Sequence, residues 1–152
     1  MGERLLVSEL STPDVDEDLL INPNGTGEID ANSKVVKRPV LRDIGEDVNP
    51  LGTVGNSVTI DVTQGNVVTA AANGLDIQWV FTGAVAGKSC SFVLILLNGG
   101  SVTITYPVGT KWIGGVAPTL TAAGEDVLAF FTLDGGASWY GVVVGLNFGA
   151  TP

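Results

Sequence analysis

Alternation of hydrophobic and polar residues dominates the C-terminal two thirds of the chain. In residues 57–62 every second side chain is apolar, and residues 101–107 repeat this pattern. A period of two indicates β-strands that turn one face inward. Residues 91–97 are apolar at almost every position, which predicts a strand buried on both faces. Further strands are predicted at residues 66–71, 75–81, 126–133 and 138–145.

Glycine-rich turns separate these predicted strands. The segments Asn98–Gly100 and Asp134–Gly136 can supply the positive φ angles that tight hairpins need. Pro107 and the Gly114–Gly115 pair break the chain around Trp112. Frequent strands without a helical period predict an all-β fold, namely an antiparallel β-sandwich or barrel-like domain over residues 51–152.

Residues 1–50 lack this regularity and contain Pro13, Pro23, Pro39 and Pro50. One interpretation is a disordered tail. The other is an extended, irregular docking arm that becomes ordered on a neighbouring protein, and the apolar pairs and triplets in this region favour it. The residues expected to contact that partner are Leu5, Leu6, Leu19, Leu20, Ile21, Val35, Val36, Arg38 and Arg42.

Charge is distributed unevenly along the 152 residues. Only 15% of the residues are charged, against about 25% in an average soluble protein. The charged residues of segment 51–152 are only these seven: Asp61, Asp76, Lys88, Lys111, Glu125, Asp126 and Asp134. An uncharged surface of that size is expected to be covered by copies of the same chain or by another molecule. The formal net charge of −9 argues against binding to nucleic acid.

Nothing in the sequence assembles a catalytic site. The chain has no histidine, which removes the commonest general base and most catalytic zinc sites. Cys90 lies in an apolar run and is interpreted as a small buried hydrophobic residue. Glu125 and Asp126 are neighbours in a predicted strand and should point to opposite faces, so a structural role is expected. We expect neither enzymatic activity nor a cofactor.

The acidic segment Asp14–Asp30 resembles a calcium-binding loop only at its start. Its aspartates are spaced as in such a loop, but Leu19 stands where glycine is required and Gly25 where a bidentate glutamate is required. We therefore interpret the segment as a strip that contacts a partner, with glycines that permit tight bends, and we expect no metal.

The aromatic residues Trp112, Trp139 and Tyr140 are the remaining candidates for a binding site. They could form a platform on which sugar rings stack, or they could pack in the core or in an interface. Trp139 and Tyr140 are adjacent on a predicted strand, so one should face each way.

The segment "SVTITYPVGTKWIGGVAPTLTAAGEDVLAFFTLDGGASWYGVVVG" resembles a module of tailed-bacteriophage virion proteins, and the similarity extends over residues 57–148. The segment "NPNGTGEIDANSKVVK" is similar to a stretch near the start of some phage tail-fibre proteins, but "RPVLRDIGEDVNP" stands where the repeats of a fibre are usually announced. This resemblance implies a structural protein of the virion, a homotrimer, without catalytic residues.

We therefore expect a capsid decoration (cement) or short fibre protein that binds capsid or tail proteins. The alternative is a tail-fibre or carbohydrate-binding module that recognises host glycans. Acidic residues interrupt the first ten positions where the apolar core of a signal peptide would lie. The longest apolar run, Phe92–Leu97, is too short to span a bilayer. Synthesis in the host cytoplasm and a place in the virion, without contact to a membrane, are the resulting expectations.

Overall fold

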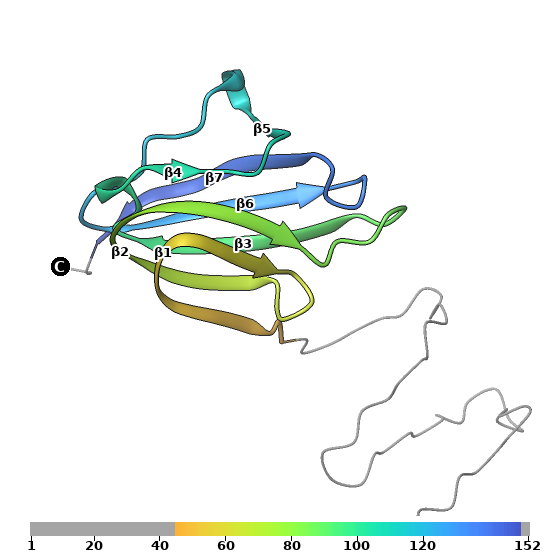
Figure 1. Ribbon diagram of the computed structural model, residues 1–152, viewed down its shortest axis with the longest axis horizontal. Helices are drawn as coiled ribbons and strands as arrows, with labels where there is room; N and C mark the ends of the chain where they lie inside the picture. Colours follow the sequence, from red (N-terminus) through yellow and green to blue (C-terminus); the bar gives the residue numbers. More distant parts are fainter. Residues whose placement is uncertain (1–44, 150–152) are drawn as a thin grey trace, which may run out of the picture. The chain divides into compact units, whose positions relative to one another are not determined.

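The computed structural model describes residues 45–149, which form one mixed β-sheet with short connections (Figure 1). The strand order is β1-β2-β3-β6-β7-β5, and β4 pairs with β2 outside this path. The expected all-β class is confirmed. The strands are β1 (Val48–Asp61), β2 (Val67–Thr82), β3 (Cys90–Leu97), β4 (Ile104–Thr105), β5 (Thr110–Trp112), β6 (Glu125–Thr132) and β7 (Trp139–Phe148).

The sheet is mixed, whereas an antiparallel one was expected. Strand β2 runs parallel to β1, β3 and β4, and β5 runs parallel to β7. Only the pairs β3–β6 and β6–β7 are antiparallel. The reason lies partly in the turn at Asn98, which leads into the 3-10 helix η1 (Gly99–Ser101) instead of a hairpin. The chain then leaves β3 and crosses to β2.

The second predicted hairpin, between β6 and β7, is present. Gly135 and Gly136 have φ angles of 72° and 90°, as the turn requires. The buried hydroxyl of Thr132 accepts a hydrogen bond from the Gly136 backbone N–H at 3.0 Å. Asp134 accepts hydrogen bonds from the Ser138 N–H and the Thr132 hydroxyl, and these bonds keep the pKa of Asp134 below its usual value.

Strand β2 is one strand where the sequence predicts two, at residues 66–71 and 75–81. Residues 73–76 form a bulge in it, because Val54 pairs with Ala72 while Asn56, two residues later, pairs with Ile77. On its other edge, the first half of β2 pairs with β3 and the second half pairs with β4. The bulge thus allows one strand to belong to two parts of the curled sheet.

The core lies between these two parts of the sheet. The ring of Phe81, near the end of β2, contacts the rings of Phe92 and Phe130 at centroid distances of 4.9 and 5.0 Å. Since these partners lie on β3 and β6, the second half of β2 faces the β3–β6–β7 layer across the core. The buried apolar residues are Val54, Ile60, Val68, Ala70, Ile77, Trp79, Phe92, Leu94, Leu96, Leu128, Phe130 and Trp139.

Three features of the strands differ from those predicted. Strand β1 starts at Val48, so its first three residues fall within the predicted arm of residues 1–50. In residues 101–107 the predicted alternation is present, but only Ile104–Thr105 pair with another strand. Strand β3 is buried on one face only: Phe92, Leu94 and Leu96 point inward, whereas the other face is half-buried or exposed although it is also apolar.

Candidate functional site

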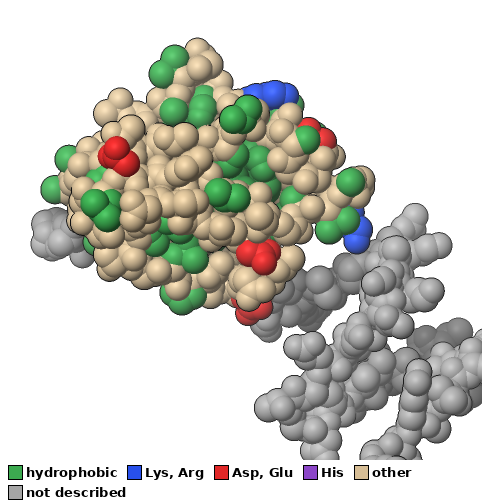
Figure 2. Space-filling view, viewed as in Figure 1, with side chains coloured by type: hydrophobic (Ala, Val, Ile, Leu, Met, Phe, Trp, Pro, Cys, Tyr) green, Lys and Arg blue, Asp and Glu red, His purple; other side chains and the backbone are tan. Residues whose placement is uncertain are grey.

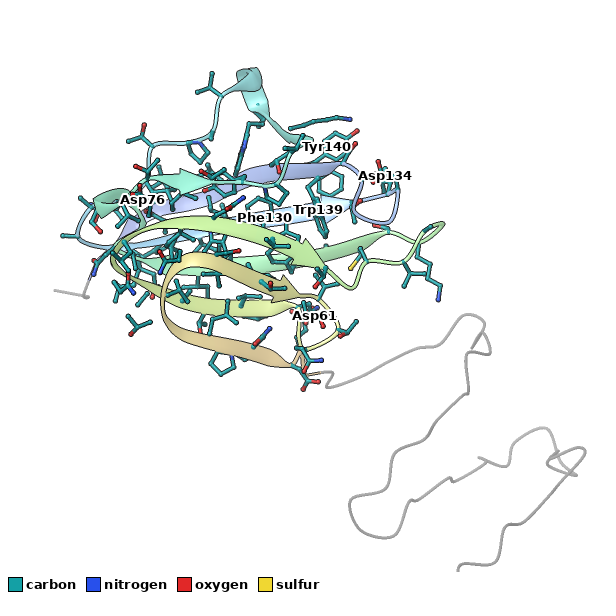
Figure 3. The ribbon with its side chains drawn as sticks, in the orientation of Figure 1. Asp61, Asp76, Phe130, Asp134, Trp139 and Tyr140 are labelled. Atoms are coloured by element: carbon teal, nitrogen blue, oxygen red, sulfur yellow. The ribbon has the colours of Figure 1, made fainter. Side chains whose placement is uncertain are left out.

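Two of the three predicted binding aromatics lie in the core or pack against it. Trp139 is 1% exposed, and its ring contacts those of Phe81 and Phe92 at 5.3 and 5.5 Å. Phe130, labelled with Trp139 in Figure 3, contacts the same two rings at 5.0 and 5.1 Å. Trp112 is partly buried and packs edge-on against Tyr106 at 4.8 Å. Neither indole forms the open platform that the glycan-binding alternative assigned to it.

Tyr140 is 36% exposed and points away from the core, which confirms that Trp139 and Tyr140 face opposite ways. Its cross-strand neighbour on β6 is Phe131, whose ring is stacked against that of Tyr140 at 4.8 Å with an angle of 10°. Lys111 pairs with Tyr140 from β5, and its Nζ lies over the tyrosine ring at 4.9 Å. Strands β6 and β5 flank β7, so both faces of the Tyr140 ring are covered.

Sequence reasoning missed Phe131, although the pattern contained a signal for it. Phe130 and Phe131 are adjacent on one strand, so only one of them can point inward. Phe130 is 1% exposed and Phe131 is 37% exposed. An exposed phenylalanine directly opposite Tyr140 indicates that the outer face of this layer is not an ordinary solvated face.

Apolar side chains continue from this pair across the outer face of β3, β6 and β7. The register places Val93 beside Ala129 and Ala129 beside Val142, and the next row joins Ile95 to Val127. Leu97 and Phe148 flank Glu125 in the last row. We call this surface the apolar face; its members are Val93, Ile95, Leu97, Val127, Ala129, Phe131, Tyr140, Val142 and Phe148.

The apolar face contrasts with the usual pattern of a sheet that covers a core on one side. Such sheets alternate between apolar residues inside and polar residues outside. Here both sides of the layer are apolar, and the charged residues that adjoin the face are Lys111 at one end and Glu125 at the other. Figure 2 shows few charged side chains on the side of the molecule seen there.

The buried carboxylate Asp126 fixes the end of this layer. It is 0% exposed, and its Oδ2 accepts a hydrogen bond from the Thr121 backbone N–H at 2.6 Å. Its Oδ1 accepts from the Thr121 hydroxyl at 2.7 Å and from the Asn147 N–H at 2.9 Å. Asp126 thus ties the loop before β6 to the end of β7. Glu125 points to the other face, as predicted for adjacent strand residues.

Acidic residues elsewhere do not converge on a site. Figure 3 shows Asp61, Asp76 and Asp134 at three separate places. Within residues 45–149, no group of three or more His, Cys, Asp or Glu side chains is arranged to bind a metal ion. Asp61 accepts hydrogen bonds from the backbone N–H and hydroxyl of Thr63, and these bonds lower the pKa of Asp61.

Cys90 is half-buried at the start of β3, so it is less buried than expected. It lines an open hollow together with Glu46, Asp47 and several serine, threonine and glycine residues. Among residues 45–149, no Lys or Arg side chain lines this hollow.

The predicted contact residues of the arm lie outside the described residues. They are Leu5, Leu6, Leu19, Leu20, Ile21, Val35, Val36, Arg38 and Arg42, and the acidic segment Asp14–Asp30 lies outside as well. In the described part of the chain, no helix is long and apolar enough to cross a lipid bilayer.

Comparisons with known proteins assign no relative to this chain. No protein-family model matches it, and neither a curated protein nor a solved structure shows a significant similarity. A function for this chain is therefore inferred from its own sequence, fold and surfaces.

Proposed function

We propose that this chain is a non-enzymatic structural protein of a tailed-bacteriophage virion, either a capsid decoration (cement) protein or a short fibre. Its β domain, a sandwich of two layers, would associate into a homo-oligomer, which the resemblance in residues 57–148 implies to be a trimer. Its N-terminal arm would dock on capsid or tail proteins. The apolar face is the observation that carries the proposal, because it gives an assembling protein a surface that a solitary one has no use for.

The charge distribution supports an assembly role. Each copy has a formal net charge of −9, so acidic surfaces of two copies would repel one another. The interior of the apolar face contains no ionisable group except the Tyr140 hydroxyl, and it is the kind of surface on which like-charged copies can meet. Eleven of the 16 acidic residues lie in residues 1–50, where they would contact a different molecule.

The arm is assigned to docking by its composition. It combines short apolar groups with acidic and basic side chains, which suits a strip that gains affinity from buried apolar contacts and register from charges. Residues 5–7 and 19–21 are runs of three large apolar side chains, and residues 34–42 contain four of its five basic residues.

The test is co-sedimentation of purified protein with virions of the phage that encodes it. Full-length protein should bind at a fixed number of copies per particle, whereas protein lacking residues 1–44 should not bind. This deletion ends before β1 starts at Val48, and circular dichroism of the shortened protein checks that the β domain is intact. Equal binding by both proteins would contradict the docking arm, and failure of the full-length protein to bind would contradict the virion role.

A second candidate function, recognition of host glycans, is supported by the exposed Phe131–Tyr140 pair. The Tyr140 ring is covered on both faces, so within this pair only the side of Phe131 that faces β3 offers an aromatic surface to a sugar. If this function operates, the full-length protein should bind a glycan array, and Phe131→Ala should abolish that binding. An array without signal would exclude it.

A further inference from the structure

We infer that the apolar face on the outer side of β3, β6 and β7 is the surface by which one copy of this chain binds another. The inference deepens the proposed function and rests on its claim that the β domain self-associates. It assigns that association to one of the two outer faces of the sheet and to named residues.

The exposed area of the apolar face supports a second copy as its occupant. Five of its members are more than a third exposed, namely Leu97, Phe131, Tyr140, Val142 and Phe148. With the half-buried members, the exposed apolar area is on the order of 500 Å², near the upper limit for the largest patch on a typical monomer. A standard interface buries about 800 Å² per partner, of which about 450 Å² is apolar. The face alone can supply that apolar area.

The other outer face of the sheet provides the contrast. The outward residues of β1 from Ser57 onward, of β2 after the bulge, and of β4 are Ser57, Thr59, Asp61, Gln78, Val80, Thr82 and Thr105. Val80 is the only large apolar side chain among these seven. This second surface, which we call the polar face, follows the alternation of a sheet that borders water. The association is therefore assigned to the apolar face and not to the polar face.

The two faces offer a matched pair of substitutions. Val142 on the apolar face is 36% exposed, and Val80 on the polar face is 37% exposed. Both are outward-facing valines on strands, so Val142→Asp and Val80→Asp impose the same chemical change on similar surroundings. Only Val142→Asp would place a charge within an interface, where a buried, unpaired carboxylate is costly.

Sedimentation velocity of the full-length protein over a range of concentrations tests this inference. The unmodified chain should sediment as an oligomer, and Val142→Asp should raise the dissociation constant by about 100-fold or more. Val80→Asp should leave the dissociation constant within a factor of about three of the original, as for a surface change.

A second variant covers the case in which Val142→Asp fails to fold. Leu97 is 42% exposed and pairs with Glu125 on β6, so Leu97→Lys introduces a charge that finds an opposite charge in the free subunit. It should fold and should weaken association by at least tenfold. Circular dichroism and tryptophan fluorescence check the fold of every variant.

The possible failures are distinguishable. If the unmodified chain is an oligomer and the folded variants of the apolar face sediment like it, the face assignment is wrong while self-association stands. If the unmodified chain sediments as a single subunit, the inference is overturned. The occupant of the apolar face would then be residues 1–44 of the same chain or a different protein. Loss of virion binding alone, with association intact, would contradict the virion role and not the face.

Discussion

The two outer faces of the sheet cover the same core but differ in what they present to their surroundings. On the polar face, Ser57 and Gln78 form one row and Thr59 and Val80 the next. On the apolar face, the corresponding rows consist mainly of valine, isoleucine, leucine, alanine and aromatic side chains. The inward residues of both layers are mostly apolar, so the core does not explain the difference. The proposed association accounts for the difference, because the polar face would then border water and the apolar face a second copy of the chain.

The largest difference in stability is expected between two aspartates when each is replaced by alanine. Asp126 is buried beneath the apolar face, and Asp61 lies in a turn beside the polar face. Asp126 accepts three hydrogen bonds in a fully buried position, so Asp126→Ala leaves the N–H groups of Thr121 and Asn147 without their partner. We expect the free energy of unfolding to fall by about 3 to 5 kcal/mol. Denaturant titration measures this loss.

Asp61→Ala is the matched control. Asp61 also accepts hydrogen bonds from a backbone N–H and a hydroxyl, both from Thr63, but it does so in an exposed turn. Water can replace it there, so the loss should be far smaller than for Asp126→Ala. Equal losses for the two variants would show that Asp126 is not the buried anchor of this layer.

The inner and outer sides of β7 should tolerate added volume differently. A Cβ at Gly141 would lie 2.5 to 2.8 Å from three indole carbons of Trp112, which is packed against the core. Gly141→Ala should therefore cost about 2 kcal/mol of stability. A Cβ at Gly145 would meet the ring of Phe148, which is half exposed and can move, so Gly145→Ala should cost less than about 1 kcal/mol. Thermal unfolding compares the two variants, and the reverse order would contradict this packing.

The buried Tyr106 should make the protein sensitive to alkali. Burial raises the pKa of Tyr106 far above its usual value, with a smaller contribution from Asp126. The Tyr106 hydroxyl loses its proton near pH 10 in the unfolded chain but retains it in the native protein. The free energy of unfolding is therefore unaffected by Tyr106 below pH 10 and decreases as the pH rises above 10. The contribution of Tyr106 to this decrease should be about 1 kcal/mol at pH 11.

Tyr106→Phe should remove that contribution and change stability little at pH 7, because the Tyr106 hydroxyl has no hydrogen-bond partner within residues 45–149. Tyr140→Phe, on the apolar face, is the control and should leave the contribution of Tyr106 in place. Denaturant titrations at pH 7 and pH 11 measure both. An unchanged alkaline slope in Tyr106→Phe would contradict the role given to burial.

The rim of the apolar face should give the smallest effect. Lys111→Met keeps most of the side-chain stem but removes the charge above the Tyr140 ring. The expected loss is about 0.5 kcal/mol, as for an exposed cation–π contact. Lys88→Met, in the loop before β3, is the control. If the two variants have the same denaturation midpoint, the contact contributes nothing measurable.

The sequence predicted the strands better than their partners. Alternation located most strands and the opposite directions of Trp139 and Tyr140, because that signal depends only on neighbouring residues. It could not show that residues 66–71 and 75–81 are one bent strand, since the bulge at residues 73–76 looks like a loop. Pairing and direction depend on contacts between residues far apart in the chain, and the turn at Asn98 did not reveal that the chain crosses to β2 instead of forming a hairpin.

The candidate site was predicted only in outline. The scarcity of charge indicated a covered surface but not its place, because composition does not distinguish the two faces of a curled sheet. The residues 91–97 were interpreted as a strand buried on both sides, and they turn out to be buried on one side and to contribute Val93, Ile95 and Leu97 to the apolar face. A strand that is apolar on both sides can lie within one subunit or between two, and the sequence of one chain looks the same in both cases.

Sedimentation equilibrium of the unmodified, full-length protein tests the central claim most directly. The claim is that the charge-poor side of the sheet is covered by a second copy of the chain. The account predicts a molar mass that is a multiple of 15.6 kDa, and three times that value for the expected trimer. A mass of 15.6 kDa at every concentration up to the solubility limit would contradict it.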